Sequence, residues 1–520
     1  MNFWSPRADR RWTAALVAAF VLFWFGGAWR QPPAFDACYN LLSWQNLALG
    51  KGFVYDYNEQ LLPFDPTIST GATLYLPVYL LWRMLDATPY EAALVIMGGY
   101  WSAFLVGIFF IVLRDRWRLP AALLFWVLIL ARAPFFEGTA FFDTPLGEPL
   151  AVMLMVAGLY LAVAHRRWWL GLLVVGLAVE VKTNVAVALL PTLALAWWRE
   201  APAASWRARG LVGAASVAIV LLPHAFAQRI VPRLALDEPQ QIVWATAYAQ
   251  RQAYVADRGF GHIAALTDPA QGRSRYMARL GEKIDLAAGY FAGSRALLAG
   301  YLVLLVAAAL WAWCQREWTF YLFAFALGVY GWWFLLLEQA WYRYWSSGDF
   351  AVVVALTVLA AGGRYPSAET AARGVEERGR AFSALLIALM LAVTVPSFSG
   401  ATLLRHFDAT ERRDLRAMAR DLAAFEREAV FTYGWFQAPQ LMLLTRQRFL
   451  SLQDRARLER AAAAGAPLYF LQTGENRLIQ TEMDALAPYV TPAIVHGYAR
   501  LSRIADVAGL RRALNARPAP

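Results

Sequence analysis

The sequence predicts a polytopic α-helical membrane protein with a small α/β domain in its C-terminal part. Hydrophobic residues make up 59% of the 520 residues and charged residues only 16%, against about 25% in soluble domains. The mean hydropathy is +0.40. Apolar segments recur along residues 1–399, whereas residues 400–520 alternate short strand-like and helix-like stretches. We expect about 11 transmembrane helices in the first part and an extracytoplasmic domain in the second.

The excess of positive charge is typical of a membrane protein with basic cytoplasmic loops and contacts to lipid phosphate groups. The formal net charge of +11 comes almost wholly from arginine, since the only lysines are Lys51, Lys182 and Lys283. Arginine clusters between apolar segments predict that the loops around residues 116, 166 and 207 are cytoplasmic. No arginine-rich tract with interleaved aromatic residues is long enough to predict nucleic-acid binding.

The lengths of the apolar segments predict the topology. Segment 12–29 follows an arginine cluster and lacks a small-residue cleavage site, so we expect a retained anchor with a cytoplasmic N-terminus. Segment 73–85 is too short to cross and is predicted to lie at the membrane interface. Segment 170–198 is predicted to form a hairpin of short, tilted helices. The other crossings are expected at 91–113, 119–136, 145–164, 210–228, 296–313, 318–337, 350–361 and 381–398.

The first external loop, 30–72, carries the strongest candidate residue, Asp36. Asp36 opens a stretch with helix-like apolar spacing at Cys38, Leu41, Leu42 and Leu49, which predicts a helix lying along the membrane surface. Gly50 and Gly52 are expected to end this helix. The carboxylate of Asp36 has two interpretations, a functional group or a cap for the helix N-terminus.

Other polar groups are predicted on the same side of the membrane. A second acidic loop, FFEGTAFFDTPLGEP, holds Asp143 and Glu148. Lys182 sits near the turn of the short hairpin, where it is expected either to face a cavity or to pair with Glu180. The outer loop 338–349 carries Arg343 and Tyr344, and the alternative for this arginine is snorkelling to lipid headgroups. The long external loop 229–294 is predicted to fold as amphipathic helices.

Carboxylates opposite fixed cations suit one kind of chemistry. A carboxylate can deprotonate an acceptor hydroxyl while the cations stabilise a departing phosphate. A site at the membrane would suit a leaving group that is attached to a lipid.

Four motifs, in their order along the chain, resemble the GT-C superfamily of polyprenol-phosphate-dependent glycosyltransferases. FDACYN resembles the first-loop Asp motif of that superfamily, and FDTPLGEPLA resembles its second acidic motif. GLAVEVKTNVAVALLP is similar to its short helical hairpin, and WYRYWSSGDFAVVVAL to its late Arg-Tyr motif. The external C-terminal domain resembles that of the aminoarabinose and protein mannosyl transferases. The residue after Asp36 is Ala37, where protein mannosyltransferases commonly carry a second acid.

The resemblance implies a reaction and a set of roles. Asp36 would be the catalytic base of an inverting transfer, with Asp143 or Glu148 as a second carboxylate. Lys182, Arg343 and Tyr344 would hold the lipid phosphate. The partners implied are a polyprenyl-phosphate-linked sugar donor and a lipid or glycan acceptor, at the extracytoplasmic side of a bacterial inner membrane. No cofactor is implied; the five histidines are scattered, and a divalent cation held by carboxylates alone stays open.

The C-terminal part and two alternative functions complete the expectations. Strands are predicted at 430–435, 467–472 and 493–501, with helices at 410–429, 454–464 and 476–486, which suggests a parallel sheet. There is no GxGxxG loop to predict nucleotide binding. The alternatives are a transporter or flippase, which the absence of an internal repeat disfavours, and an oligosaccharide polymerase or ligase that uses a lipid-diphosphate donor.

Overall fold

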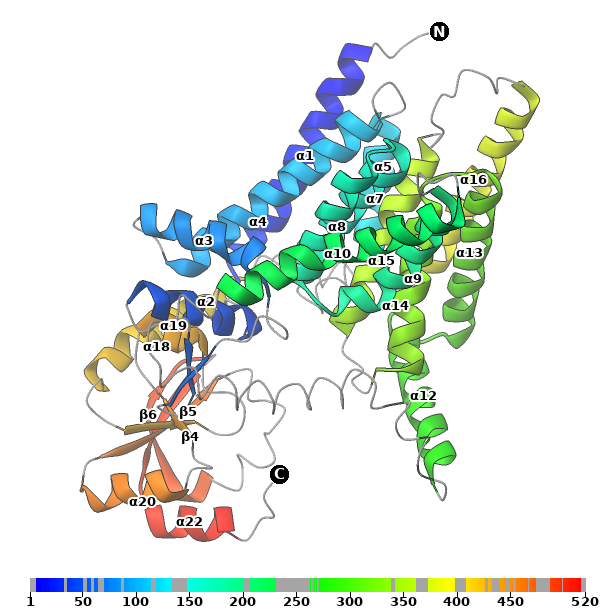
Figure 1. Ribbon diagram of the computed structural model, residues 1–520. Helices are drawn as coiled ribbons and strands as arrows, with labels where there is room; N and C mark the ends of the chain where they lie inside the picture. The colour runs from blue at the N-terminus through cyan, green and yellow to red at the C-terminus, as the bar shows by residue number, and fades with distance from the viewer. Residues whose placement is uncertain are drawn as a thin grey trace.

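The computed structural model has a bundle of apolar helices beside a smaller part built on a β-sheet (Figure 1). The structure describes residues 6–31, 35–49, 54–57, 60–63, 70–85, 88–113, 118–132, 147–200, 205–230, 262, 266, 268, 271–337, 342–361, 373–397, 408–425, 429–432, 439–445, 449–451, 455–465, 467–473, 487–497 and 499–515.

The helical part confirms the predicted class of polytopic membrane protein. Among the described residues, five helices are long and apolar enough to cross a membrane. They are α1 (Pro6–Ala28), α4 (Pro89–Val106) with η1 (Gly107–Val112), α7 (Gly147–Leu159) with η2 (Tyr160–Ala164), α10 (Trp206–Ile230) and α13 (Arg295–Cys314). Shorter apolar helices are α5 (Arg118–Ala131), α8 (Trp168–Val181) and α14 (Phe320–Leu335). Short apolar stretches also lie within α15 (Tyr342–Ala360), at Tyr344–Ala360, and within α16 (Arg373–Thr394), at Ala384–Thr394.

The predicted short hairpin is present as α8 followed by α9 (Val185–Glu200), with its turn at residues 182–184. Helix α8 can pack closely on α7 because the contact contains two glycines. A Cβ added at Gly158 would lie 2.6 Å from Val175 Cγ2, and one added at Gly171 would lie 2.5 Å from Ala162 N. Small residues that let backbones approach are typical of helix packing in membranes.

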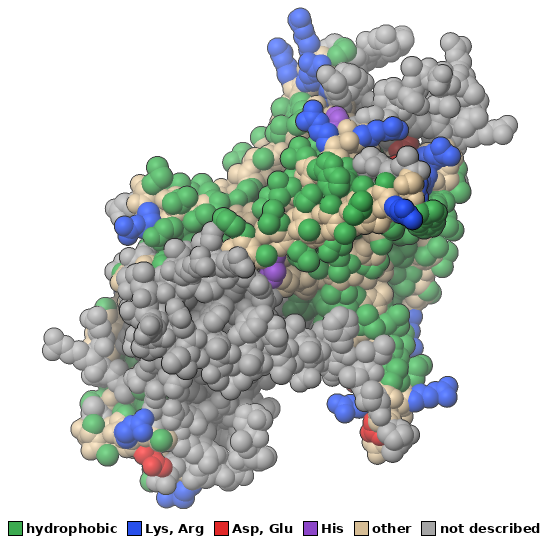
Figure 2. Space-filling model, in the orientation of Figure 1, with side chains coloured by type: hydrophobic (Ala, Val, Ile, Leu, Met, Phe, Trp, Pro, Cys, Tyr) green, Lys and Arg blue, Asp and Glu red, His purple; other side chains and the backbone are tan. Residues whose placement is uncertain are grey.

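The outer surface of the helical part is apolar. Figure 2 shows hydrophobic side chains over its visible face, with Lys and Arg side chains beyond its upper end. On α10, large hydrophobic side chains are exposed along the helix, namely Trp206, Leu211, Val217, Leu221, Leu222 and Phe226. Such a contiguous apolar surface indicates contact with lipid.

The first loop contains more structure than the sequence predicts. The expected surface helix is α2 (Phe35–Ala48), in which Cys38, Leu41 and Leu42 are buried while Leu49, just after it, is exposed. A two-stranded antiparallel hairpin follows, β1 (Val54–Tyr57) with β2 (Gln60–Pro63). The interfacial helix is α3 (Ala72–Met84). Gly50 and Gly52 lie outside the described residues.

The C-terminal sheet has five strands in the order β4-β3-β5-β7-β6. The strands are β3 (Ala429–Thr432), β4 (Leu450–Ser451), β5 (Leu468–Thr473), β6 (Val490–Val495) and β7 (Ala499–Ile504). The described helices of this part are α18 (Thr410–Leu422), α19 (Pro439–Thr445), α20 (Arg455–Ala463) and α22 (Val507–Asn515). The helix expected over 476–486 lies outside the described residues.

The expectation of a parallel sheet is wrong for half of this sheet. Strands β3, β4 and β5 are parallel, but β7 runs antiparallel to both β5 and β6. The single strand expected over 493–501 is a hairpin instead. The chain reverses there, with His496 N donating to Ala499 O at 2.9 Å, and Gly497 supplies a residue that turns favour.

The C-terminal part is attached to the membrane part through α2 and α4, and Figure 1 shows α19 beside α2, with α18 next to α19. Gln45 Nε2 of α2 donates to Leu443 O of α19 at 3.4 Å. Glu91, at the start of α4, pairs with Arg412 at 3.3 Å and Arg416 at 3.0 Å, both on α18. The described part of the loop 229–294 includes α12 (Gly272–Gly289), whose Lys283 is fully buried.

The boundary expected before the late membrane helix is wrong by two turns. Residues 342–349, predicted to be loop, form the first part of α15, and Ser346, Ser347 and Asp349 are buried. A carboxylate can lie inside an apolar bundle when a cation and hydrogen bonds satisfy it. Asp349 meets this condition because Arg132 Nε donates to it at 2.7 Å.

Candidate functional site

Three segments meet at the end of the bundle that lies against α2: residues 70–73, 147–148 and 180–182. We call them the junction. The segments come from the end of the first loop, the first turn of α7 and the turn of the hairpin α8–α9. Gly71 N donates to Val181 O at 3.0 Å, and Gly147 N donates to Thr70 Oγ1 at 3.1 Å. These bonds connect parts of the chain that the sequence places far apart.

Glu180 caps a helix other than its own. The N-cap residue of α3, Gly71, has no side chain to accept a hydrogen bond. Ala72 N and Thr73 N donate instead to the two carboxylate oxygens of Glu180, at 2.7 and 3.0 Å. A carboxylate at a helix N-terminus satisfies free N–H groups and complements the helix dipole. Glu180 therefore fixes the start of α3 to the end of α8.

The junction is close-packed at its two glycines. A Cβ at Gly71 would overlap the backbone carbonyl and the side chain of Glu180. A Cβ at Gly147 would lie 2.8 Å from Val181 O. The absence of a side chain at both positions is what allows the three segments to approach.

Lys182 and Glu148 form a buried ion pair in the junction. Lys182 Nζ lies 3.3 Å from Glu148 Oε1, and the side chains are 12% and 2% exposed. Neither carboxylate oxygen of Glu148 accepts a hydrogen bond from a residue that the structure describes. Buried carboxylates are normally hydrogen-bonded, so Glu148 differs from Glu180 and Asp349, whose oxygens accept hydrogen bonds.

Tyr75 adds a buried hydroxyl next to this pair. Its side chain is 0% exposed, and Asn40 of α2 and Thr70 are its hydrogen-bonding neighbours. Burial, with a further contribution from the Cys38 thiol, raises the pKa of Tyr75 well above its usual range. The phenol is therefore uncharged beside the Glu148–Lys182 pair.

The structure unites two of the predicted site residues. Glu148 and Lys182 are in contact, and the ion partner of Lys182 is Glu148 rather than Glu180. Tyr344 lies in the first turn of α15, half-buried, with its ring 5.5 Å from that of Trp332.

The other three predicted residues are described only in part. Asp36 is the second residue of α2 and Arg343 the second residue of α15, but their side chains lie outside the described set. Asp143 lies wholly outside it. Because Asp36 is in the first turn of α2, capping and catalysis both remain consistent with its position. Among the described side chains, no group of three His, Cys, Asp or Glu could hold a metal ion.

A second buried ionic cluster lies where α5, α13, α14 and α15 meet. Asp349 Oδ2 accepts from Arg132 Nε at 2.7 Å, and Asp349 Oδ1 accepts from Tyr301 Oη at 2.6 Å and Tyr330 Oη at 2.8 Å. Arg132 Nη1 donates to Tyr290 O at 3.0 Å. Arg132 is not recognisable as a functional residue from the sequence, because it follows a uniformly apolar segment and resembles an ordinary interfacial arginine.

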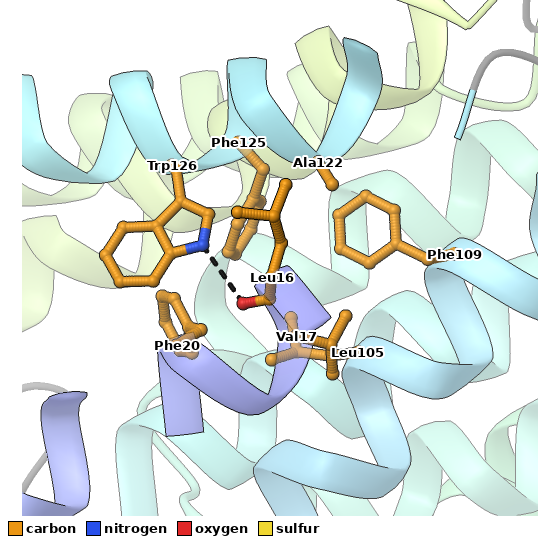
Figure 3. Close-up of a pocket in the computed structure, with 8 residues that line it drawn as sticks. All are labelled: Leu16, Val17, Phe20, Leu105, Phe109, Ala122, Phe125 and Trp126. Carbon is orange, nitrogen blue, oxygen red and sulfur yellow. Dashed lines mark hydrogen bonds between the residues drawn. The ribbon is translucent and has the colours of Figure 1, made fainter. Parts of the chain in front are cut away.

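An apolar cavity elsewhere in the bundle has no such chemistry. It lies between α1, α4 with η1, and α5, and Figure 3 shows its lining residues, Leu16, Val17, Phe20, Leu105, Phe109, Ala122, Phe125 and Trp126. The indole N–H of Trp126 is used in a hydrogen bond to Leu16 O at 3.1 Å. The lining has no titratable side chain, so this cavity offers nothing that would bind phosphate or activate a hydroxyl.

This chain is similar to known proteins in structure but matches none of those compared by sequence. No protein-family model and no curated protein sequence matches the chain. The solved structures of ArnT from Cupriavidus metallidurans, one bound to undecaprenyl phosphate and one apo, are each 13% identical, with a TM-score of 0.53. Each alignment covers 96% of this chain and 99% of ArnT. The archaeal oligosaccharyltransferase AglB from Archaeoglobus fulgidus is 11% identical with a TM-score of 0.47, over 93% of this chain and 73% of AglB.

The likeness to ArnT extends over nearly the whole of both chains. It confirms the GT-C-like fold that the sequence motifs predict, including helices in the first loop and an α/β part after the last membrane helix.

Proposed function

We propose that this protein is a membrane glycosyltransferase that moves a sugar from a polyprenyl-phosphate donor to an extracytoplasmic lipid or glycan acceptor. The observation that carries the proposal is the Glu148–Lys182 pair, a largely buried cation beside a carboxylate whose oxygens accept no hydrogen bond from the described residues. The pair lies in a chain with the fold of ArnT, a protein whose structure holds undecaprenyl phosphate. The site would lie at the extracytoplasmic side of a bacterial inner membrane.

Lys182, with Arg343 and Tyr344, would bind the donor phosphate. The ammonium of Lys182 is compact, 12% exposed, and held from one side by Glu148, which leaves donor protons for a phosphate oxygen. A fixed cation in a site with little water stabilises the negative charge that develops on a leaving phosphate. Removing such a group typically lowers turnover on the order of 10²–10³-fold.

Asp36 would be the general base of a single displacement. The acceptor hydroxyl gives its proton to the Asp36 carboxylate, and its oxygen forms the new bond to C1 of the sugar. The bond from C1 to the phosphate oxygen breaks, and its electron pair leaves with the polyprenyl phosphate. One displacement without a covalent intermediate inverts the anomeric centre. Glu148 or Asp143 would accept hydrogen bonds from the acceptor.

The test is release of polyprenyl phosphate from lipid-linked sugars by detergent-purified protein. Asp36→Asn should lower turnover about 10²–10⁴-fold, because Asn keeps the shape but cannot take the proton, while donor affinity is retained. Lys182→Ala should weaken donor binding, and Lys182→Arg should not restore full activity because a planar fork replaces a point charge. Near-normal turnover of Asp36→Asn would show that this residue only caps α2, since Asn caps nearly as well. Absence of sugar transfer and of polyprenyl phosphate binding by the wild type would refute the proposal as a whole.

A further inference from the structure

Arg343 and Tyr344 lie at the start of α15, and a buried lysine contacts the chain just before it, at the end of α14. Lys283 of α12 is 0% exposed, and its ammonium reaches the last carbonyls of α14. Lys283 Nζ donates to Trp333 O at 2.9 Å and to Leu337 O, and it lies 3.2 Å from His262 Nδ1. A cation at a helix C-terminus satisfies carbonyls that lack partners in the helix. Lys283 thus fixes the chain at Leu337, six residues before Arg343.

A second buried contact follows Arg343 and Tyr344. Asp349 lies six residues after Arg343 and holds α15 to α5 through Arg132. Two tyrosine hydroxyls, from α13 and α14, complete the hydrogen bonding of its carboxylate. Between the two contacts, Trp345 stacks on Tyr330 with centroids 4.2 Å apart, so the start of α15 has one packed orientation on α14.

We propose that Lys283 and Asp349 are positioning residues that hold the first turn of α15, with Arg343 and Tyr344, in the geometry that binds the donor phosphate. This inference rests on the proposed function. Lys283 also connects α12 of the long external loop to the C-terminal end of α14, through the carbonyls of Trp333 and Leu337. Neither residue needs to touch the donor for this role.

The chain contains a matched control for these contacts. Helix α5 has a buried arginine at each end, Arg132 at the end that meets Asp349 and Arg118 at the other. Arg118 pairs with Asp9 at 3.7 Å, and its Nε donates to Phe109 O at 3.1 Å. Loss of Arg118 also removes a buried cation, but at the opposite end of α5 from the first turn of α15.

The experiment compares Lys283→Met, Asp349→Asn and Arg118→Met in the purified full chain, below the unfolding temperature of every variant. Lys283→Met and Asp349→Asn should lower turnover on the order of 10²-fold, since a displacement of about 1 Å in a site has such an effect. Both should weaken the binding of polyprenyl monophosphate and speed amide hydrogen exchange over residues 342–350. Lys283→Arg should recover part of the affinity because it keeps donors at the end of α14. Arg118→Met should lower the unfolding midpoint alone.

Three outcomes would overturn the inference. In the first, Lys283→Met and Asp349→Asn have lower unfolding midpoints than the wild type but the same turnover and the same affinity for polyprenyl monophosphate. Another is an equal effect of Arg118→Met on affinity, and the third is unchanged exchange over 342–350. If Asp349→Asn does not fold, the double variant Arg132→Gln with Asp349→Asn is used in its place, because it leaves no unpaired charge in the bundle. A wild type that binds no polyprenyl phosphate refutes the proposed function, and exchange then still decides whether the two residues hold α15.

Discussion

The two buried acid–base pairs of the helical part differ in how their carboxylates are satisfied. Asp349 accepts three hydrogen bonds of 2.6–2.8 Å, from Arg132, Tyr301 and Tyr330. Glu148 accepts none from the residues that the structure describes, and its cation lies 3.3 Å away. Both carboxylates are 2% exposed, so burial does not explain the difference. The carboxylate of Asp349 is satisfied by described residues of the protein, whereas no described residue donates a hydrogen bond to that of Glu148.

This difference predicts different purposes for the two pairs. A buried ion pair stabilises a fold only when further hydrogen bonds offset the loss of hydration, and the Asp349 cluster has them. The Glu148–Lys182 pair has none from the described residues, and such a cost in stability is typical of functional sites. We therefore regard the Asp349 cluster as part of the framework and the junction as the place where chemistry would occur.

The largest expected effect comes from breaking the pair of Arg132 and Asp349. Arg132→Leu should lower the free energy of unfolding by about 3–5 kcal/mol, because it leaves the Asp349 carboxylate buried without its cation. The double variant Arg132→Leu with Asp349→Leu should recover most of this loss, since no charge then remains in the apolar bundle. Unfolding in detergent measures both. A double variant no more stable than the single one would show that the cluster's hydrogen bonds, and not its charge balance, hold these helices.

The pair of Glu148 and Lys182 should respond mainly in turnover. Glu148→Gln keeps the shape of the side chain and loses no hydrogen bond to a described residue, but it removes the counter-charge of Lys182. The unfolding midpoint should therefore fall, though by less than in Arg132→Leu because Lys182 is 12% exposed. Turnover should fall on the order of 10²-fold, because the charged acceptor for a ligand hydroxyl is gone. The two quantities are measured on the same preparation. A large fall in the midpoint with normal turnover would mean that the contrast between the pairs is wrong and that Glu148 is a framework residue.

Helix positions followed from the sequence because long apolar runs can only be satisfied as helices in lipid. The pairing of charges did not. Glu180 is the acid nearest to Lys182 in sequence, yet α8 ends at Val181 and Lys182 has an extended backbone (φ −152°, ψ 104°), so the two side chains follow different backbone geometries. Glu180 reaches α3 and Lys182 reaches α7. No local pattern encodes which helix each would meet.

The start of α15 was mispredicted for a similar reason. Asp349 has the appearance of a loop residue until its partner is known, and Arg132 is 217 residues away. The mixed C-terminal sheet was missed because β6 and β7 read as one strand when the reversal at His496 and Gly497 is overlooked. In both places the deciding interaction is between parts of the chain that sequence periodicity cannot relate.

The smallest expected effect tests whether the junction acts as one unit with the pair of Glu148 and Lys182. Glu180→Gln keeps one carbonyl acceptor for the N-terminus of α3 but loses the second oxygen and the charge. It should cost roughly 0.5–2 kcal/mol, as the loss of a helix cap does. Gly71→Ala disturbs the same contact by steric overlap, because its Cβ would overlap Glu180. It should lower the free energy of unfolding by about 1–3 kcal/mol. Gly99→Ala is the control, because a Cβ there meets nothing within 4 Å.

If Glu180 holds the first loop against the turn that carries Lys182, both Glu180→Gln and Gly71→Ala should reduce turnover more than their stability loss explains. The reduction should be in kcat rather than in the KM for the donor. Lys182 keeps its partner Glu148 in both variants, whereas α3 and the loop before it, which carries Asp36, lose their fixed relation to it. Turnover that stays normal below the unfolding midpoint would limit Glu180 to a cap for α3.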